Sequence, residues 1–160
     1  MPLRPIQASD NAALAAIVRT VSAEFGLAAS QGFAVADTVL DDLYRVYSQD
    51  GAAYWVLVDE VGVVVGGGGV APLAGAEGIL EIQKMYFLPS ARGQGAAREL
   101  LQRCFAFGAQ CACHGFYLET TANLKQAITL YEQQGFAYLA QPLGNTGHSG
   151  ACEIYMHRPL

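Results

Sequence analysis

A strand-like run that passes through a glycine-rich turn into a helical pattern most constrains the fold of this chain. The run Gly78–Leu88 is ended by Pro89 and leads through Arg92-Gly93-Gln94-Gly95. A second strand-like run, Gly115–Thr120, follows the helical segment. These segments predict a β-α-β unit of an α/β protein. The apolar face of the helix is formed by Ala97, Leu100, Leu101, Cys104, Phe105 and Gly108.

Two amphipathic segments come before this unit. Asp10 can cap a first helix and Asp37 a second. The first stripe consists of Leu14, Ile17, Val18, Val21 and Phe25, and the second of Leu40, Leu43, Tyr44 and Tyr47. After Gly51 the period changes to that of strands.

A hairpin and a closing set of elements complete the pattern. The runs Tyr54–Val58 and Val63–Val70 are joined by Asp59-Glu60-Val61-Gly62, which is typical of a hairpin. In the second run, Gly66–Gly69 predicts a bulge or a close approach of backbones. A further helix with an apolar face is expected to end at Gly135; its face is formed by Leu124, Ala127, Ile128 and Tyr131. Two last strands are expected at Phe136–Gln141 and Cys152–His157, separated by the loop Gly144–Gly150.

Composition narrows the class of protein. The 160 residues carry no linker or repeat and indicate one domain over residues 1–160. Hydrophobic residues make up 52% and charged residues 14%, which excludes a disordered chain. The longest charge-free stretch, Val61–Ala76, contains glycines and Pro72, so no membrane-spanning helix is expected. The N-terminal segment has no apolar signal core, and a cytoplasmic protein is expected.

Net charge limits the classes of binding partner, and the cysteine spacing bears on disulfides and metal sites. A net charge of −5 argues against nucleic acid and against an anionic membrane surface, but it leaves room for a small local anion site. No CxxC pair exists, so reduced, buried cysteines are expected and no metal site is predicted. The cysteines are Cys104, Cys111, Cys113 and Cys152.

The glycine-rich turn is the candidate binding site for an anionic ligand. Glycines let the backbone turn tightly, and the first turn of a helix offers unpaired N–H groups to an anion. Arg92 and Arg98 can add positive charge there, although the glycines can also simply form a short turn. A Walker loop is excluded because no Gly-Lys-Ser/Thr follows. The Rossmann pattern fits Gly93 and Gly95 but fails at Arg98, where a third glycine is required. Glu119 could imitate the ribose-binding acid of that fold, but a single β-α-β unit is too little for a dinucleotide-binding domain.

Three spaced elements resemble the GCN5-related N-acetyltransferase (GNAT) family. Its pattern Gln/Arg-x-x-Gly-x-Gly/Ala is matched by residues 92–97, with Ala97 where glycine is usual. The strand and proline at Lys84–Pro89 and the spacing of Asn123, Ala127, Tyr131 and Gly135-Phe136 also agree. The resemblance extends from Leu3 to Arg158 and includes Glu24–Gly26 and Thr146–Cys152, which resemble a bacterial subgroup. It implies a GNAT-like fold, with a mixed, mostly antiparallel twisted sheet flanked by helices in a single domain.

The resemblance also implies function. It points to transfer of an acetyl group from acetyl-coenzyme A (acetyl-CoA) to a primary amine of a small molecule or peptide, without a metal, and it allows a homodimer. The backbones of Met85 and Phe87 would pair with the amides of acetyl-CoA, and Asn123 would be a further polar contact. The amides that would hold the pyrophosphate belong to Arg92, Gly93, Gln94, Gly95, Ala96 and Ala97.

Catalytic roles follow from chemistry and from the same resemblance. An alkyl ammonium must lose a proton before it attacks, and Glu81, four residues before Met85, is the candidate base. Strand alternation predicts that Glu81, Gln83 and Met85 share one face. Tyr131 is the candidate acid for the departing thiolate, although it can also be only a core aromatic residue.

Several alternatives remain open at this level. Glu119, Glu24 or water can replace Glu81 as the base, and His148 can contact the substrate; His114 and His157 are further titratable candidates. The other class of function is a non-catalytic acyl-CoA sensor or interaction module on the same fold.

Overall fold

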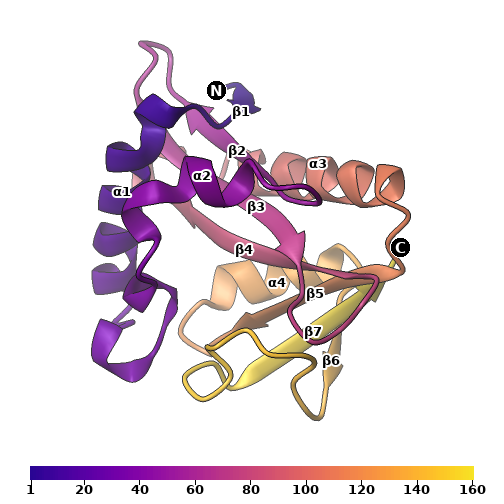
Figure 1. Ribbon diagram of the computed structural model, residues 1–160. Coiled ribbons are helices and arrows are strands. Elements are labelled where there is room, and N and C mark those ends of the chain that lie inside the picture. The colour runs from indigo at the N-terminus through magenta and orange to yellow at the C-terminus, as the bar shows by residue number, and fades with distance from the viewer.

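The computed structural model describes residues 1–160 and contains one twisted sheet of seven strands (Figure 1). The strands are β1 (Leu3–Pro5), β2 (Ala53–Val58), β3 (Val64–Pro72), β4 (Ile79–Phe87), β5 (Gly115–Thr120), β6 (Ala137–Leu139) and β7 (Ile154–Pro159). Their order is β1-β2-β3-β4-β5-β7-β6, and every neighbouring pair is antiparallel except β4 and β5. The predicted α/β fold with a mixed, mostly antiparallel sheet is confirmed.

Helices cover both faces of this sheet. The helices α1 (Asn11–Glu24) and α2 (Leu43–Tyr47) lie on one face, and α3 (Ala96–Gln110) and α4 (Lys125–Gln133) lie on the other (Figure 1). None of the helices has the length and apolar composition that a membrane crossing requires. The helix α3 connects the two parallel strands, as the β-α-β prediction required.

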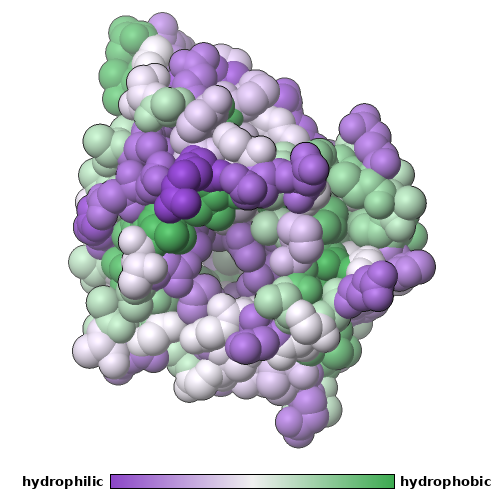
Figure 2. Space-filling view, viewed as in Figure 1, coloured by the Kyte–Doolittle hydropathy of each residue, from purple (hydrophilic) through white to green (hydrophobic).

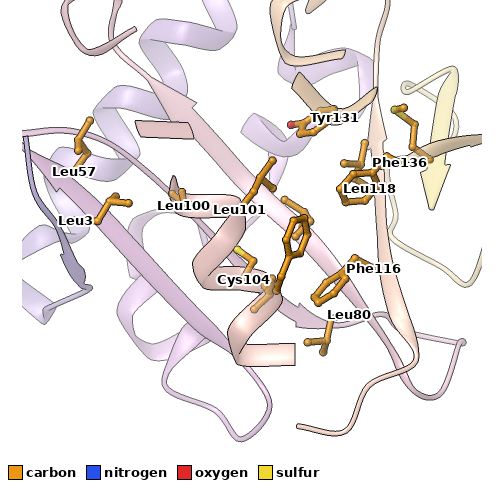
Figure 3. Close-up of a cluster of buried hydrophobic side chains, with 14 of the residues drawn as sticks. Leu3, Leu57, Leu80, Leu100, Leu101, Cys104, Phe116, Leu118, Tyr131 and Phe136 are labelled. Atoms are coloured by element: carbon orange, nitrogen blue, oxygen red, sulfur yellow. The ribbon is translucent and has the colours of Figure 1, made fainter. Parts of the chain in front are cut away.

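Each helical layer packs on its own apolar cluster. Leu14, Ala15, Val18, Leu40, Leu43, Tyr47, Tyr54 and Val56 form the cluster under α1 and α2. The larger cluster lies between the sheet, α3 and α4, and Figure 3 shows Leu100, Leu101, Cys104, Phe116, Leu118, Tyr131 and Phe136 within it. Because Leu100 and Leu101 are fully buried, truncating either to alanine should cost roughly 2–5 kcal/mol of stability.

The glycine run of β3 allows three backbones to approach closely. A Cβ on Gly66 would lie 2.3 Å from Cδ1 of Phe87, and a Cβ on Gly69 would lie 2.3 Å from the carbonyl oxygen of Ala53. Real Cβ atoms do not tolerate such distances, so a larger residue would push β2 or β4 away. The predicted close approach along Gly66–Gly69 is confirmed.

A bulge at Lys84 changes which way the second half of β4 faces. The φ of Lys84 is 48°, in the left-handed region, and the register with β3 shifts at the same point. Before the bulge, Gln83 bonds Tyr47 of α2, whereas Met85 packs against the cluster under α3. The prediction that Glu81, Gln83 and Met85 share one face is therefore wrong for Met85, because an extra residue breaks the two-residue alternation.

The parallel strands β4 and β5 pair only where they begin. Their register runs from Ile79 opposite Gly115 to Glu81 opposite Tyr117, and no pairing continues beyond Glu81. The remainder of β4 and residues 118–120 of β5 therefore have backbone groups that do not bond across this junction. This separation positions the site described below.

The segment between α1 and β2 differs from the prediction. Instead of one capped helix, it forms the 3₁₀ turns η2 (Ala29–Gln31), η3 (Ala34–Ala36) and η4 (Leu40–Asp42) before the short α2. Asp37 caps no helix; its carboxylate binds Lys84 and His148. Tyr44 is 40% exposed, so only part of the predicted apolar face is buried. Local apolar spacing was a poor guide here because distant side chains hold the segment.

Smaller differences occur elsewhere. The strand β1 was not predicted, because three residues carry too little pattern. Asp10 stands before α1, as predicted, but its carboxylate accepts from the amide of Gln7 at 2.7 Å and pairs with Arg4 instead of capping the helix. All four cysteines are free; Cys104, Cys113 and Cys152 are buried, as expected, whereas Cys111 is exposed and the expectation is wrong for it.

Candidate active site

A cavity of about 760 Å³ opens where β4 and β5 separate. Its walls come from both strands, from the C-terminal end of α1, from the beginnings of α3 and α4, and from the loop that carries His148. Figure 2 shows the surface hollowed near the centre of this view, where hydrophilic and hydrophobic patches meet. Glu81, Met85, Gly95, Asn123 and Tyr131 all line it, so the fold brings most of the predicted site residues together.

The glycine-rich turn forms one end of the cavity. Gly93 and Gly95 have φ values of 75° and 81°, which side chains other than glycine rarely adopt, and a Cβ on either would meet nothing within 4 Å. Gly95 directly precedes α3, whose first-turn amides have no partner within the helix. The turn therefore presents backbone N–H groups and the positive end of the helix dipole to the cavity.

The side chain of Arg92 fixes this turn to α1. Its guanidinium binds both carboxylate oxygens of Glu24 at 2.6 and 2.8 Å, and its Nε donates to the carbonyl of Phe87 at 3.0 Å. It also lies over the ring of Phe25, 5.2 Å from the centroid. The Arg92 charge is therefore already paired, and the Glu24–Gly26 motif serves as its anchor.

Asn123 extends this anchor to α4. Its Nδ2 donates to the carbonyl of Phe25 at 3.0 Å, which joins the end of α1 to the beginning of α4 beside the cavity. Thr120, the last residue of β5, also lines the cavity, and its buried Oγ1 has no hydrogen-bond partner. A buried hydroxyl of this kind is available to a ligand.

Glu81 is the buried carboxylate of the site. It is 6% exposed, and its Oε1 accepts from Nε2 of Gln83 at 2.6 Å. Oε1 of Gln83 in turn accepts from the Tyr47 hydroxyl at 2.8 Å, which fixes the orientation of the amide. Burial raises the pKa of Glu81, and the Gln83 bond opposes that rise. The other oxygen, Oε2, makes no hydrogen bond within the chain and remains available in the cavity.

Glu119 is held differently. Its carboxylate accepts from the hydroxyls of Tyr117 at 2.5 Å and Ser149 at 2.6 Å, and from that of Thr146. The Tyr117 hydroxyl also accepts from the amide of Leu143 at 3.2 Å. Glu119 therefore anchors the loop after β6 to β5.

Tyr131 reaches the cavity from α4. The residue is 7% exposed, and its ring packs edge-on against Phe136 with centroids 5.8 Å apart. Burial raises the pKa of the Tyr131 phenol above its usual value, so the hydroxyl keeps its proton at neutral pH. This hydroxyl makes no hydrogen bond within the chain.

A charge cluster that the sequence did not predict closes the end of the cavity near Glu81. Lys84, with a side chain 6% exposed, pairs with Asp37, and Nε2 of His148 lies 2.9 Å from Oδ1 of the same carboxylate. Burial alone would raise the pKa of Asp37, but His148 and Lys84 outweigh it and hold the pKa below its usual value. The bond to Asp37 raises the pKa of His148. The three residues lie far apart in the sequence, which indicates a possible substrate contact only for His148 and a helix cap for Asp37.

Comparisons with known proteins agree with this architecture. Residues 22–136 match the model of the acetyltransferase (GNAT) family. The chain is 52% identical over 159 residues to the uncharacterized N-acetyltransferase YjgM of Escherichia coli K12, covering 99% of this chain and 94% of that protein. The chain belongs to the GNAT acetyltransferase family.

Solved structures share the fold. A GNAT-family acetyltransferase of Staphylococcus aureus Mu50 superposes with a TM-score of 0.83 at 17% identity, over 99% of this chain and 98% of that one. A GNAT-superfamily phosphinothricin acetyltransferase of Sinorhizobium meliloti, solved in complex with acetyl-CoA, gives 0.77 at 20% identity, over 99% and 88% of the two chains. At these identities the likeness establishes the fold alone.

Proposed function

We propose that this acetyltransferase moves the acetyl group of acetyl-CoA to a primary amine. The observation that carries the proposal is one continuous cavity, which joins the glycine turn before α3 to the buried carboxylate of Glu81 and the free hydroxyl of Tyr131. An anion site, a base and an acid are the groups that this reaction requires.

The donor half fits acetyl-CoA by the chemistry of its walls. The amides from Arg92 to Ala97 suit a pyrophosphate, whereas the Arg92 side chain supports the turn from behind. The second half of β4 has no β5 neighbour, so it offers the backbone of Met85 and the amide N–H of Phe87, whose carbonyl already accepts from Arg92, to the amides of the pantetheine chain. The unpartnered Thr120 hydroxyl and the Asn123 side chain add polar contacts along the same wall.

The acceptor half supplies the chemistry at nitrogen. Oε2 of Glu81 accepts the proton of the ammonium, directly or through water, so that a neutral amine forms the C–N bond at the thioester carbonyl. Glu81 suits this role because burial raises its pKa toward the working range. Glu119 is less suited, since three hydroxyls already occupy its carboxylate.

Tyr131 suits the other proton transfer. As the C–S bond breaks, the hydroxyl, which the raised pKa keeps protonated, donates a hydrogen bond to the departing sulfur, and the sulfur takes up a proton while the tyrosine regains its own from solvent. Holding the amine and the thioester together in a partly closed cavity contributes to the rate as well.

Thiol release from acetyl-CoA across a panel of primary amines tests this proposal. The enzyme releases coenzyme A only when an acceptable amine is present, and tertiary amines of matched size give none. A sensor or interaction module binds acetyl-CoA in calorimetry but shows no amine-dependent release. Binding without release across the whole panel would therefore favour the second class of function.

A further inference from the structure

We infer that the acceptor is an apolar primary amine that carries no carboxylate, and that amino acids are rejected. The inference rests on the proposed function and concerns the part of the cavity around Glu81. Charge, shape and the pairing of side chains there all bear on it.

The acidic groups of this region outnumber its available cations. Glu81 and Glu119 both line the cavity, and Oε2 of the nearly buried Glu81 has no partner within the chain. An ammonium can fill that position with a charge-assisted hydrogen bond. A carboxylate on the same molecule would come within reach of two carboxylates in a partly desolvated site, which is unfavourable.

The cations near Glu81 are already engaged. Lys84 and His148 share the carboxylate of Asp37, so an incoming anion would have to compete with Asp37 for both charges. A substrate carboxylate that drew these charges away would leave Asp37 itself partly buried and less well paired.

The remaining cavity cations lie at the opposite end. Arg92 is held by Glu24. Arg98 and Lys125 belong to the first turns of α3 and α4, which follow the C-terminal ends of β4 and β5, whereas Glu81 lies where the two strands still pair. These cations can face the anionic donor and not the acceptor.

One wall of the cavity, beside the His148 loop, is apolar. Leu27, Phe33 and Cys152 form a small buried cluster, and all three line the cavity. The amide of Cys152 donates to the carbonyl of His148 at 2.9 Å, which places this cluster beside the loop that carries His148. A hydrocarbon or aromatic body attached to the amine gains from burial against this wall.

Matched acceptors test the inference. The pairs are 2-phenylethylamine with phenylalanine and isoamylamine with leucine. The amides of the two amino acids serve as controls, because they keep a substituent on the α-carbon but replace the charged carboxylate with an uncharged carboxamide. Rates are compared per concentration of the ammonium form, which is the form that the Glu81 carboxylate binds. We expect kcat/KM to be at least about 100-fold higher for each amine than for its amino acid, and the amides to recover most of that loss.

A variant separates charge from shape. Asp37→Asn releases Lys84 and His148, so the ratio of amine to amino acid should fall at least about 10-fold through a gain for the amino acid. Asp41→Asn, which removes the exposed partner of Arg19, is the matched control and should leave the ratio unchanged. A thermal melt verifies that both variants fold. If Asp37→Asn does not fold, the comparison of each amine with its amino acid in the wild-type enzyme still decides the inference.

The outcomes are distinct. Amino acids that equal or exceed their amines overturn the inference and would make Lys84 and His148 a carboxylate site. Amides as poor as the acids also overturn it, because branching and not charge would then explain the rejection. Absence of thiol release with every compound, from protein that binds acetyl-CoA, contradicts the proposed function itself.

Discussion

Replacing Gln83 with methionine should make the rate of acetyl transfer more sensitive to acid. Gln83 donates to Glu81 at 2.6 Å, and the Tyr47 hydroxyl holds the amide in the orientation that allows this. The bond stabilises the ionised carboxylate, so its loss raises the pKa of Glu81 beyond the rise that burial already causes. The base form then exists only at higher pH, and the acid limb of kcat/KM moves in that direction.

The size of the effect follows from the bond. A hydrogen bond to a charged group contributes about 1.5–3 kcal/mol, which corresponds to a loss of about 10- to 150-fold in kcat/KM on the acid limb. At alkaline pH, where Glu81 is ionised in both proteins, the rates should converge. The assay is the pH profile of kcat/KM for a confirmed amine, recorded beside the binding affinity for acetyl-CoA, which should not change.

Controls separate positioning from stability. Methionine leaves the buried Tyr47 hydroxyl without its partner, which should cost about 1–3 kcal/mol of folding free energy. Adding Tyr47→Phe removes that unpaired group, so the double variant should regain melting temperature while its acid limb stays displaced. A Gln83→Met profile that coincides with the wild-type profile would refute the idea that Gln83 tunes Glu81.

Three further substitutions test the donor and acceptor halves. Glu81→Gln should lower the rate most at the acidic end of the working range, and an unchanged profile would return Glu81 to a structural role. Tyr131→Phe should bind acetyl-CoA nearly normally and lose about 10- to 1000-fold in turnover; full turnover would leave Tyr131 a core residue. Gly95→Val should weaken acetyl-CoA binding strongly in calorimetry, whereas Gly62→Val, which has a similar positive φ in a remote turn, should strain the fold without changing affinity.

The elements that could be predicted from sequence are those fixed by local pattern. The hairpin of β2 and β3 and the β-α-β unit follow from periodicity and turn residues, because neighbours in sequence determine both. The glycine turn at Gly93 and Gly95 was found for the same reason, since positive φ and a helix start leave a local mark.

The acceptor side could not be predicted in this way. Asp37, Lys84 and His148 meet only because the segment after α1 and the loop after β6 fold over the β4 bulge. The bulge itself depends on pairing with the glycines of β3, and it moved Met85 to the other face of the sheet. Likewise, a carboxylate at Glu119 is visible in the sequence, but the loop hydroxyls that occupy it are not.

Transfer of an isotopic label tests the central claim most directly. The protein is mixed with acetyl-CoA that carries ¹³C in its acetyl group and with an amine that supports thiol release, and the products are measured by mass spectrometry. The account predicts one labelled amide for each coenzyme A released, and a lower yield of both from Glu81→Gln at acidic pH. Label that remains in acetyl-CoA, or that accumulates as acetate while the amine stays unmodified, would contradict it.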